Sequence, residues 1–358
     1  MRKVLKYLLI VLAIPIVIAI ISIIVLKIIN NNFIGQPDKT VVEYLQKNQL
    51  VFNERSEKDN TFSKFFNPYF YNSKVFLLGE SHGYADVQGI DKSLLIHLNK
   101  TKGVRYYIAE MDSTTANKFN AFLREETKDT LLLKEAVKGF KQRIPQQAGR
   151  ELYTKWSEIY DYNKTIADSM RISIIGIDKD MNDTSKISRD SCMFANFYNV
   201  IEQKKLTNES FYGLFGLFHV LQTGMNRDNF KTFGARLKYR GIQVESIICI
   251  DIDSEVYLPK GTFPVSPNDE KTKLLSMNGP LFLFKGIRNF EKASKKNSIT
   301  FFDLKGDATP FVNKEFKIHS KSFIFNQEIT PYSDDIPAAD IVQYVILLRN
   351  AKAINPLR

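Results

Sequence analysis

The chain has 358 residues, of which 44% are hydrophobic and 25% are charged, and this composition predicts one large globular domain or two smaller ones. Its net charge is +11, but the basic residues are scattered and mostly lysines. This distribution is typical of a solvated surface, which near a membrane would be attracted to anionic lipid. It does not favour a nucleic-acid-binding element, in which the basic residues would be gathered together. Only two cysteines are present, Cys192 and Cys249, outside any CxxC motif or Cys/His cluster. A disulfide framework and a thiolate zinc site are therefore not expected.

An apolar run near the N-terminus predicts a membrane-spanning helix. Residues 7–26 carry no charge over twenty positions, which is long enough to cross a bilayer as a helix. A cleaved signal peptide usually has a shorter apolar region that ends at a small-residue cleavage site, and no A-x-A motif follows this run. A core helix at the very start of a chain would rarely be so uniformly rich in isoleucine, leucine and valine. The sequence therefore predicts a signal anchor over residues 1–30.

The charges that flank the run predict its orientation. Three basic residues precede it, whereas Lys27 alone follows it closely. The positive-inside rule then places the N-terminus in the cytoplasm and the rest of the chain on the other side of the membrane. We expect a single-pass protein of the cell membrane whose main domain, residues 41–358, is extracytoplasmic. The polar, turn-rich residues 31–40 are expected to form a short linker.

Beyond residue 40, runs with the character of buried strands alternate with runs of helical periodicity. Strands are expected at residues 74–79, 104–109, 171–177, 211–218 and 244–250, and helices at residues 89–100, 113–127, 151–170, 188–205 and 227–241. This alternation predicts an α/β fold, with a mainly parallel sheet and flanking helices. Residues 260–296 are expected to hold loops or an insertion, and residues 298–306 and 340–350 to add strands at the sheet edge.

Acidic residues or histidines follow all five of these strands. In chain order they are Glu80 and His82, Glu110 and Asp112, Asp178 and Asp180, His219, and finally Asp251 and Asp253. The ligand crevice of an open α/β sheet lies at the carboxyl ends of its strands. A carboxylate there can also cap a helix or stabilise a turn, an alternative that applies most to Asp112, Asp180 and Asp253. We expect one catalytic pocket that is formed by Glu80, His82, Glu110 and His219. Asp178 and Asp251 are expected to lie around it as substrate-binding residues.

The four histidines fall into two pairs. His82 and His219 each close a Gly-x-x-His sequence at the end of a strand, which favours a functional role for both. His97 lies on an amphipathic helix and His319 lies in a lysine-rich tail, so these two are expected to be structural or surface residues.

These motifs resemble those of the erythromycin esterase, ChaN, TraB and Tiki superfamily. Tiki and TraB proteins carry paired Gly-x-x-His motifs with a glutamate between them, matched here by residues 79–82, Glu110 and residues 216–219. Erythromycin esterases have a Trp-bearing helix, an asparagine and a strand ending in Gly-x-Asp, matched here by Trp156, Asn163, Gly176 and Asp178. Residues 343–357 also resemble the terminal strand of that family and the proline after it. The resemblance covers the chain from residue 75 onward and implies a hydrolase.

Two hydrolytic mechanisms are open at this stage. His82, Glu110 and His219 can serve as ligands of a divalent ion, such as zinc, manganese or cobalt, whose bound water attacks the substrate. Without a metal, His82 would activate water directly, with Glu80 or Glu110 fixing its tautomer. The resemblance implies both, since Tiki proteins are metalloproteases and erythromycin esterases are treated as histidine-based enzymes. The expected substrate is a small molecule or a peptide.

A binding protein is the alternative class. ChaN-type members are associated with haem, and a domain anchored at the membrane can capture haem or a metal with the same residues and without turnover. A third interpretation makes the cluster purely structural, because a shared fold does not confer activity.

Overall fold

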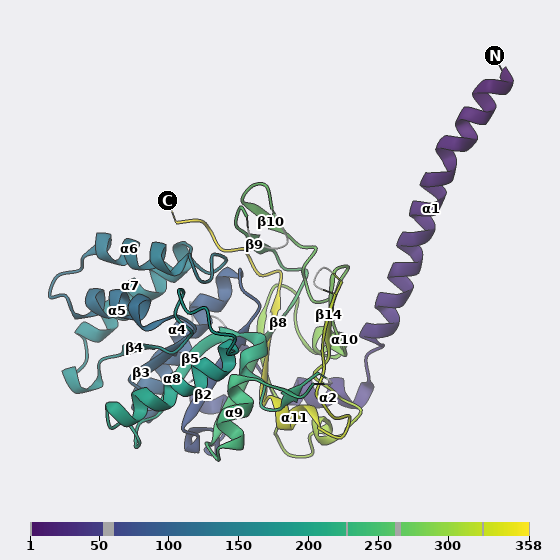
Figure 1. Ribbon diagram of the computed structural model, residues 1–358. Helices are drawn as coiled ribbons and strands as arrows, with labels where there is room; N and C mark the ends of the chain where they lie inside the picture. The colour runs from purple at the N-terminus through teal and green to yellow at the C-terminus, as the bar shows by residue number, and fades with distance from the viewer. Residues whose placement is uncertain (1, 53–60, 227, 262–265, 324–325, 358) are drawn as a thin grey trace.

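The computed structural model describes residues 2–52, 61–226, 228–261, 266–323 and 326–357, with side chains described from residue 13 onward. A long N-terminal helix, α1 (Arg2–Ile34), leads into an α/β domain that holds all the other elements (Figure 1). The domain has a mostly parallel sheet with helices on both faces, so the predicted fold class is confirmed.

The central sheet has eight strands in the order β1-β12-β15-β8-β2-β5-β3-β4. Its six strands from β15 to β4 are parallel, whereas β12 is antiparallel to both β1 and β15. Because β5 lies between β2 and β3, the carboxyl ends of these three strands are neighbours. The strands are β1 (Gln49–Phe52), β2 (Val75–Glu80), β3 (Tyr106–Ala109), β4 (Ser173–Gly176), β5 (Phe211–Gly216), β8 (Val244–Ile252), β12 (Ile299–Asp303) and β15 (Tyr344–Arg349).

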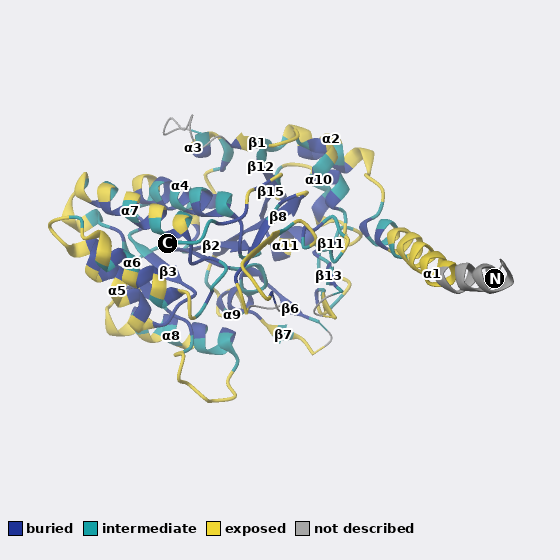
Figure 2. Ribbon diagram, turned by 90° about the horizontal axis from the view of Figure 1, so that it is seen from above, coloured by how far each residue is buried: buried dark blue, intermediate teal, exposed yellow. Residues whose placement is uncertain are grey.

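Both faces of the sheet are buried, which explains the near-continuous apolar character of its strands. Phe76 and Leu78 of β2 belong to the core on one face, and Val75 and Leu77 belong to the core on the other, because successive side chains of a strand point to opposite sides. Figure 2 shows the buried strands between the two helical layers. The first layer contains α3 (Thr61–Phe65), α4 (Ala85–Lys102), α5 (Ser113–Arg124), α6 (Thr130–Phe140) and α7 (Arg150–Lys164), and the second α2 (Lys39–Lys47), α8 (Arg189–Gln203), α9 (Phe233–Tyr239), α10 (Ile287–Ala293) and α11 (Ala338–Ile341).

Smaller antiparallel sheets lie outside the central one. They pair β6 (Gly224–Met225) with β7 (Phe230–Lys231), β9 (Val256–Leu258) with β10 (Glu270–Thr272), and β11 (Phe282–Phe284) with β13 (Ser320–Ser322) and β14 (Gln327–Ile329). Residues 260–296, expected to hold loops or an insertion, include β10, β11 and α10 among their described residues.

The two late strands join the sheet differently from the prediction. They form β12 and β15, but β15 pairs with β8 and lies inside the sheet. The edge on this side is β1, a four-residue strand that the sequence analysis did not predict.

The last turns of α1 pack directly on the domain. The Arg288 guanidinium donates to Asn31 Oδ1 at 2.6 Å and to the Gly35 carbonyl at 3.1 Å, and Gly286 N donates to the Ile34 carbonyl at 2.9 Å. Residues 31–40, expected to form a linker, comprise the end of α1, four residues without regular secondary structure and the start of α2.

One segment of α1 has the properties of a membrane span. Residues Ala13–Ile34 are long and apolar enough to cross a bilayer: the most apolar stretch of 18 residues has a mean hydropathy of 2.6, and 6% of that stretch is buried. The side chains of residues 1–12, which include the basic residues used to predict orientation, lie outside the described part of the chain.

Candidate active site

Three neighbouring strands bring four of the predicted site residues together. β2 ends at Glu80 and continues to His82, Glu110 follows β3, and β5 leads into a short 3-10 helix that carries His219. An unbroken series of side-chain contacts of 4.0 Å or less connects Glu80, His82, Glu110 and His219. The predicted convergence at the carboxyl edge of the sheet therefore matches the geometry.

Glu80 and His82 form a hydrogen-bonded pair. His82 Nδ1 lies 3.1 Å from Glu80 Oε1, and the Gln147 side chain donates a hydrogen bond to the same oxygen. The Glu80 side chain is fully buried, whereas 23% of the His82 side chain is exposed. A buried carboxylate at Nδ1 favours the tautomer that carries a proton there, and Nε2 then faces Glu110 Oε2 at 4.0 Å without a proton.

Glu110 is at the centre of the cluster. Its Oε2 accepts a 2.5 Å hydrogen bond from Gly216 N and lies 4.0 Å from His82 Nε2. Its Oε1 accepts a 2.7 Å hydrogen bond from the Arg189 guanidinium and lies 3.5 Å from His219 Nε2. Both carboxylate oxygens of Glu110 are thus already engaged by N–H groups.

His219 is held between two carboxylates. Its Nδ1 lies 2.8 Å from Asp190 Oδ1, and its Nε2 faces Glu110. Phe233 N, at the start of α9, donates to the same Asp190 oxygen at 2.7 Å. The ring of His219 is therefore fixed at both nitrogens.

Arg189 links this cluster to Asp178. Besides Glu110, its guanidinium contacts both Asp178 oxygens, with Nε 3.1 Å from Oδ1. Arg143 also lies 3.4 Å from Asp178 Oδ2. Asp178, predicted to bind substrate, is thus next to the cluster, with its buried carboxylate paired to two arginines.

The charges of the cluster shift its pKa values in opposite directions. Burial raises the pKa of Glu80, although His82 and Gln147 oppose this. Burial would also raise the pKa of Glu110, but the charges of His219, His82 and Arg189 outweigh it and lower that pKa well below its usual range. Burial lowers the pKa of His219, but Glu110 and Asp190 together raise it to about 10. At neutral pH, Glu110 is therefore ionised and His219 is a cation.

Gly216 provides the space in which the two histidines and Glu110 meet. A Cβ atom at this position would lie 3.3 Å from His82 Nε2, 3.5 Å from Glu110 Oε2 and 3.5 Å from the His219 ring. A glycine here lets the backbone approach closely and adds no side chain of its own between His82 Nε2 and Glu110.

The other predicted residues lie apart from this cluster. Asp251 is buried on β8, accepts a 2.6 Å hydrogen bond from Ser276 Oγ and lies beside Tyr84, and no described contact joins it to either histidine. Asp112 caps α5 through Thr115 N, and Asp180 accepts from Asn182 N in a turn, so the capping and turn alternatives describe both.

The remaining histidines lie outside the cluster. His97 is buried among aromatic rings and lies 2.8 Å from the Tyr71 hydroxyl, whereas His319 pairs with Glu328 near the surface. Both positions agree with the structural and surface roles predicted for them.

The sequence analysis missed three residues that complete the cluster. Arg189 and Asp190 lie in the first turn of α8, a helix that was predicted, and two adjacent charges at its start were the available signal. Gln147 precedes α7 in a segment without strand or helix periodicity, so nothing in the sequence singled it out.

No protein-family model and no curated protein matches the sequence. Solved structures share its fold. A Bacillus cereus protein from a structural genomics programme superposes with a TM-score of 0.61 at 13% identity, covering 89% of this chain and 99% of that one. A succinoglycan biosynthesis protein gives the same TM-score and identity, covering 88% and 98%. A histidine-to-asparagine variant of the erythromycin esterase EreC, in its open conformation, gives 0.50 at 10% identity, covering 88% and 97%. The chain has an erythromycin esterase-like fold.

Some families in the group that the motifs resemble use a metal, and a catalytic divalent ion needs about three protein side chains whose ligand atoms are free to face it. Within the described residues, no group of three His, Cys, Asp or Glu side chains is arranged to hold one. Glu110 accepts N–H bonds at both oxygens, and one donor is the permanently charged Arg189 guanidinium. A second cation beside it would be repelled, so this arrangement of His82, Glu110 and His219 does not fit a metal site.

Proposed function

We propose that this chain is a membrane-anchored ester hydrolase in which His82 activates the attacking water. The observation that carries the proposal is the Glu80–His82 pair, in which Glu80 binds Nδ1 and Nε2 faces the space beside Glu110. A histidine oriented by a buried carboxylate is a common general base. The fold shared with a protein named as an erythromycin esterase supports the same class of reaction.

The proposed reaction transfers one proton in each direction. His82 Nε2 takes a proton from water as the water oxygen bonds to the ester carbonyl carbon, and the carbonyl electron pair moves onto its oxygen. The negative charge of Glu80 stabilises the imidazolium that forms. When the intermediate collapses, the bond to the alcohol oxygen breaks and His82 returns the proton to that oxygen. The products are a carboxylic acid and an alcohol, and His82 is regenerated.

The cationic part of the cluster supplies the complementary role. His219 and Arg189 both carry positive charge and both contact Glu110, at 3.5 Å and 2.7 Å. Because 38% of the Arg189 side chain is exposed, it can also reach a bound substrate. We assign these two groups to stabilisation of the oxyanion and Glu110 to holding them in position. Asp178 then acts by orienting Arg189, and binding of the substrate by Asp178 or Asp251 remains a further proposal.

Membrane attachment is part of the same proposal. The apolar segment Ala13–Ile34 supports an anchor, and the basic residues before the run support a cytoplasmic N-terminus with an extracytoplasmic domain. The substrate would then be a small molecule or a peptide outside the cytoplasm.

The test is a panel of ester and peptide substrates offered to the purified full chain in detergent. We expect ester hydrolysis, with kcat/KM lowered about 10²–10⁴-fold in His82→Ala. His219→Gln should also be strongly impaired, whereas His319→Ala, a histidine outside the cluster, should retain activity. If His82→Ala hydrolyses esters as well as the unaltered chain, the proposal is wrong.

The same sample distinguishes the alternatives. Elemental analysis that finds about one equivalent of zinc, manganese or cobalt, lost in His82→Ala and His219→Gln, would favour the metal-dependent mechanism. Peptide cleavage alone would favour a peptidase, and a Soret absorbance band without turnover would favour a haem-binding protein.

A further inference from the structure

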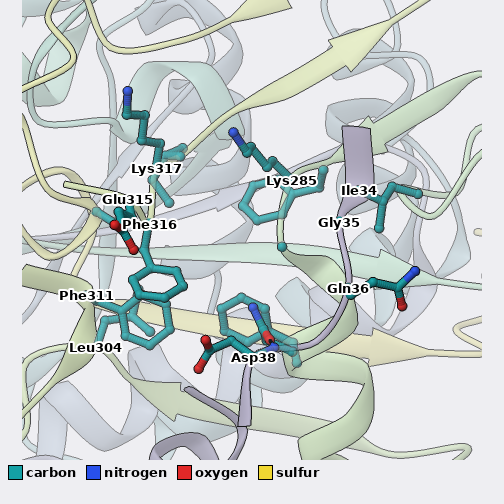
Figure 3. Close-up of a pocket in the computed structure, with 16 residues that line it drawn as sticks. Ile34, Gly35, Gln36, Asp38, Lys285, Leu304, Phe311, Glu315, Phe316 and Lys317 are labelled. Carbon is teal, nitrogen blue, oxygen red and sulfur yellow. Dashed lines mark hydrogen bonds between the residues drawn. The ribbon is translucent and has the colours of Figure 1, made fainter. Parts of the chain in front are cut away.

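A mainly apolar cavity of about 160 Å³ lies where α1 joins the domain (Figure 3). It is on the β12 side of the sheet, whereas the candidate active site is at β2, β5 and β3. Ile34, the last residue of α1, forms part of its wall. The rest of the wall is rich in large apolar side chains, including Phe284, Phe290, Leu304, Phe311, Phe316 and Ile318.

The size and chemistry of the cavity fit a hydrocarbon ligand. A cavity of about 150 Å³ lined by Leu, Ile and Phe remains dry in water and binds benzene, so this one is large enough for a short stretch of hydrocarbon. Water gains few hydrogen bonds against such a wall, whereas an apolar ligand gains by leaving water.

The position of the cavity puts it next to the proposed membrane surface. The uncharged apolar run of residues 7–26 extends for about 30 Å as a helix and matches a hydrocarbon core of about 30 Å, and Ile34 lies eight residues, about 12 Å, beyond its end. The Arg288 and Gly286 contacts fix the domain to the end of α1. If this run spans the bilayer, the wall of the cavity begins close to the lipid headgroups, about 12 Å beyond the end of the hydrocarbon core.

The rim of the cavity carries two cations. In Figure 3 the ammonium groups of Lys285 and Lys317 lie on the same side, above the phenylalanine rings. Lys285 is exposed and forms no ion pair with any described residue, and Lys317 pairs with the highly exposed Asp334. Two acids, Asp38 and Glu315, also line the cavity, and Asp38 is engaged as the N-cap of α2.

We propose that this cavity, which we call the anchor pocket, binds one acyl chain of an anionic membrane phospholipid, with the phosphate at Lys285 and Lys317. The proposal rests on the proposed membrane anchoring, because the lipid comes from the bilayer that α1 crosses. A lysine with no ion-pair partner beside an apolar cavity matches the two parts of a lipid, and each basic residue near an anionic surface adds attraction. The bound lipid would hold the domain in one orientation on the membrane.

The experiment uses the full chain reconstituted into phosphatidylglycerol vesicles whose acyl chains carry bromine, which quenches tryptophan on contact. A Phe316→Trp variant puts a reporter in the wall of the anchor pocket, and the native Trp156 is fully buried in the opposite helical layer. We expect Phe316→Trp to lose about half of its emission relative to unbrominated vesicles, since the reporter contacts the chain directly. The unaltered chain should lose almost none.

Two controls separate a bound chain from general immersion in lipid. Phe33→Trp puts the reporter on α1 at a similar depth but outside the anchor pocket, where the Phe33 ring meets His319 edge to face. Equal quenching of Phe33→Trp and Phe316→Trp would overturn the proposal. The charge reversals Lys285→Glu and Lys317→Glu together should abolish the quenching, whereas the matched pair Lys292→Glu and Lys296→Glu, exposed residues outside the pocket, should not.

The remaining outcomes decide between the two proposals. Failure of the chain to enter vesicles overturns the membrane anchor, whereas insertion without quenching overturns the anchor pocket alone. If brominated phosphatidylcholine quenches Phe316→Trp as strongly as brominated phosphatidylglycerol does, the proposed preference for an anionic headgroup is wrong. If Phe316→Trp does not fold, native mass spectrometry of the unaltered chain replaces it: a retained phosphatidylglycerol, lost on reversal of both lysines, supports the proposal, and lipid-free protein contradicts it.

Discussion

Gly216 is the residue at which the strand geometry and the proposed chemistry meet most closely. Its backbone N–H binds Glu110, and its missing side chain leaves room beside His82 Nε2. Its φ and ψ, −57° and 140°, are open to any residue, so the glycine is needed for space and not for its backbone conformation.

Gly216→Ala therefore tests the free space alone. The added methyl group would lie 3.3 Å from His82 Nε2. It should lower kcat/KM roughly 10–100-fold, because small displacements of reacting groups strongly reduce the reaction rate. Stability should change by less than about 1 kcal/mol, since no polar partner is lost. Kinetics and thermal unfolding of the same sample check both parts.

Gly139→Ala is the matched control. Gly139 lies in α6, where the added methyl group would meet only the flexible end of Lys118 at 3.4 Å. Alanine is favoured in a helix by about 1 kcal/mol, so this variant should be fully active and slightly more stable. Full activity of Gly216→Ala would mean that the reaction does not use the space beside His82.

Asp251 gives a second prediction at the residue scale. Burial raises the pKa of its carboxyl group to about 7, from a usual value of 3.8. The folded state therefore holds this proton when the unfolded state has released it, and the free energy of unfolding falls as the pH rises from 3.8 to about 7. This difference in pKa between the unfolded and folded states corresponds to a decrease of at most about 4 kcal/mol in the free energy of unfolding.

Asp251→Asn should remove this decrease in the free energy of unfolding at higher pH. Asparagine stays neutral at every pH, so at pH 8 the variant should be more stable by about 1–2 kcal/mol, after allowance for the charged hydrogen bond with Ser276. At pH 4 the two proteins should be nearly equal. Urea unfolding at the two pH values is the measurement, and destabilisation at pH 8 would show that the ionised carboxylate is needed. A raised KM in the same variant would support the predicted role in substrate binding.

At the scale of elements, the C-terminal segment, residues 351–357, holds together the two loops that build the Glu80–His82 pair. Ile354 N donates a hydrogen bond to the carbonyl of Gly83, the residue after His82. Arg150 N, three residues after Gln147, donates a hydrogen bond to the Asn355 carbonyl. Asn355 also binds both oxygens of Glu151 at 2.9 and 2.7 Å. The segment therefore fixes loops on either side of the site.

Deletion of residues 353–358 should loosen both loops while leaving the central sheet folded. Amide hydrogen exchange is expected to increase at residues 81–85 and 147–151 and to stay slow in β2 and β8. The rate of ester hydrolysis should also fall, because the loops that position Gln147 and His82 are no longer held by the C-terminal segment. Deletion of residues 357–358 alone is the control. Unchanged exchange at both loops would mean that the segment has no positioning role.

The elements also show what the sequence could predict. Because both faces of the sheet are buried, the central strands are near-continuous apolar runs that could be recognised in the sequence, and their carboxyl ends pointed to His82, Glu110 and His219. The partners that arrive from elsewhere in space, such as Gln147, depend on tertiary packing that has no local pattern. The same holds for Lys155, whose buried ion pair with Asp91 joins α7 to α4 at 2.6 Å.

At the scale of the whole molecule, α1 extends away from the domain, and the contacts of its described residues with the domain lie in its last turns (Figure 1). The direct contacts at Asn31 and Gly35 leave little room between the domain and a bilayer that α1 would cross. The orientation of the chain therefore decides which compartment supplies the substrate.

An added protease should digest residues 31–358 in cells whose outer barriers are opened and whose inner membrane is intact. The positive-inside rule predicts this result, because the basic residues precede the apolar run. Immunoblotting for the domain is the measurement, with a cytoplasmic protein as the control for membrane integrity. Protection of the fragment would reverse the predicted orientation.

The central claim is that Glu80 and His82 activate water without a metal ion. The most direct measurement is kcat/KM for an ester in chelator-treated, metal-free full-length protein, compared among the unaltered chain, His82→Gln and Glu80→Gln. We predict full activity in the unaltered chain, a loss of about 10²–10⁴-fold in His82→Gln, and a clear but smaller loss in Glu80→Gln, whose amide still contacts the ring. Loss of all activity on chelation with recovery on adding zinc, manganese or cobalt, or equal activity of His82→Gln, would contradict it.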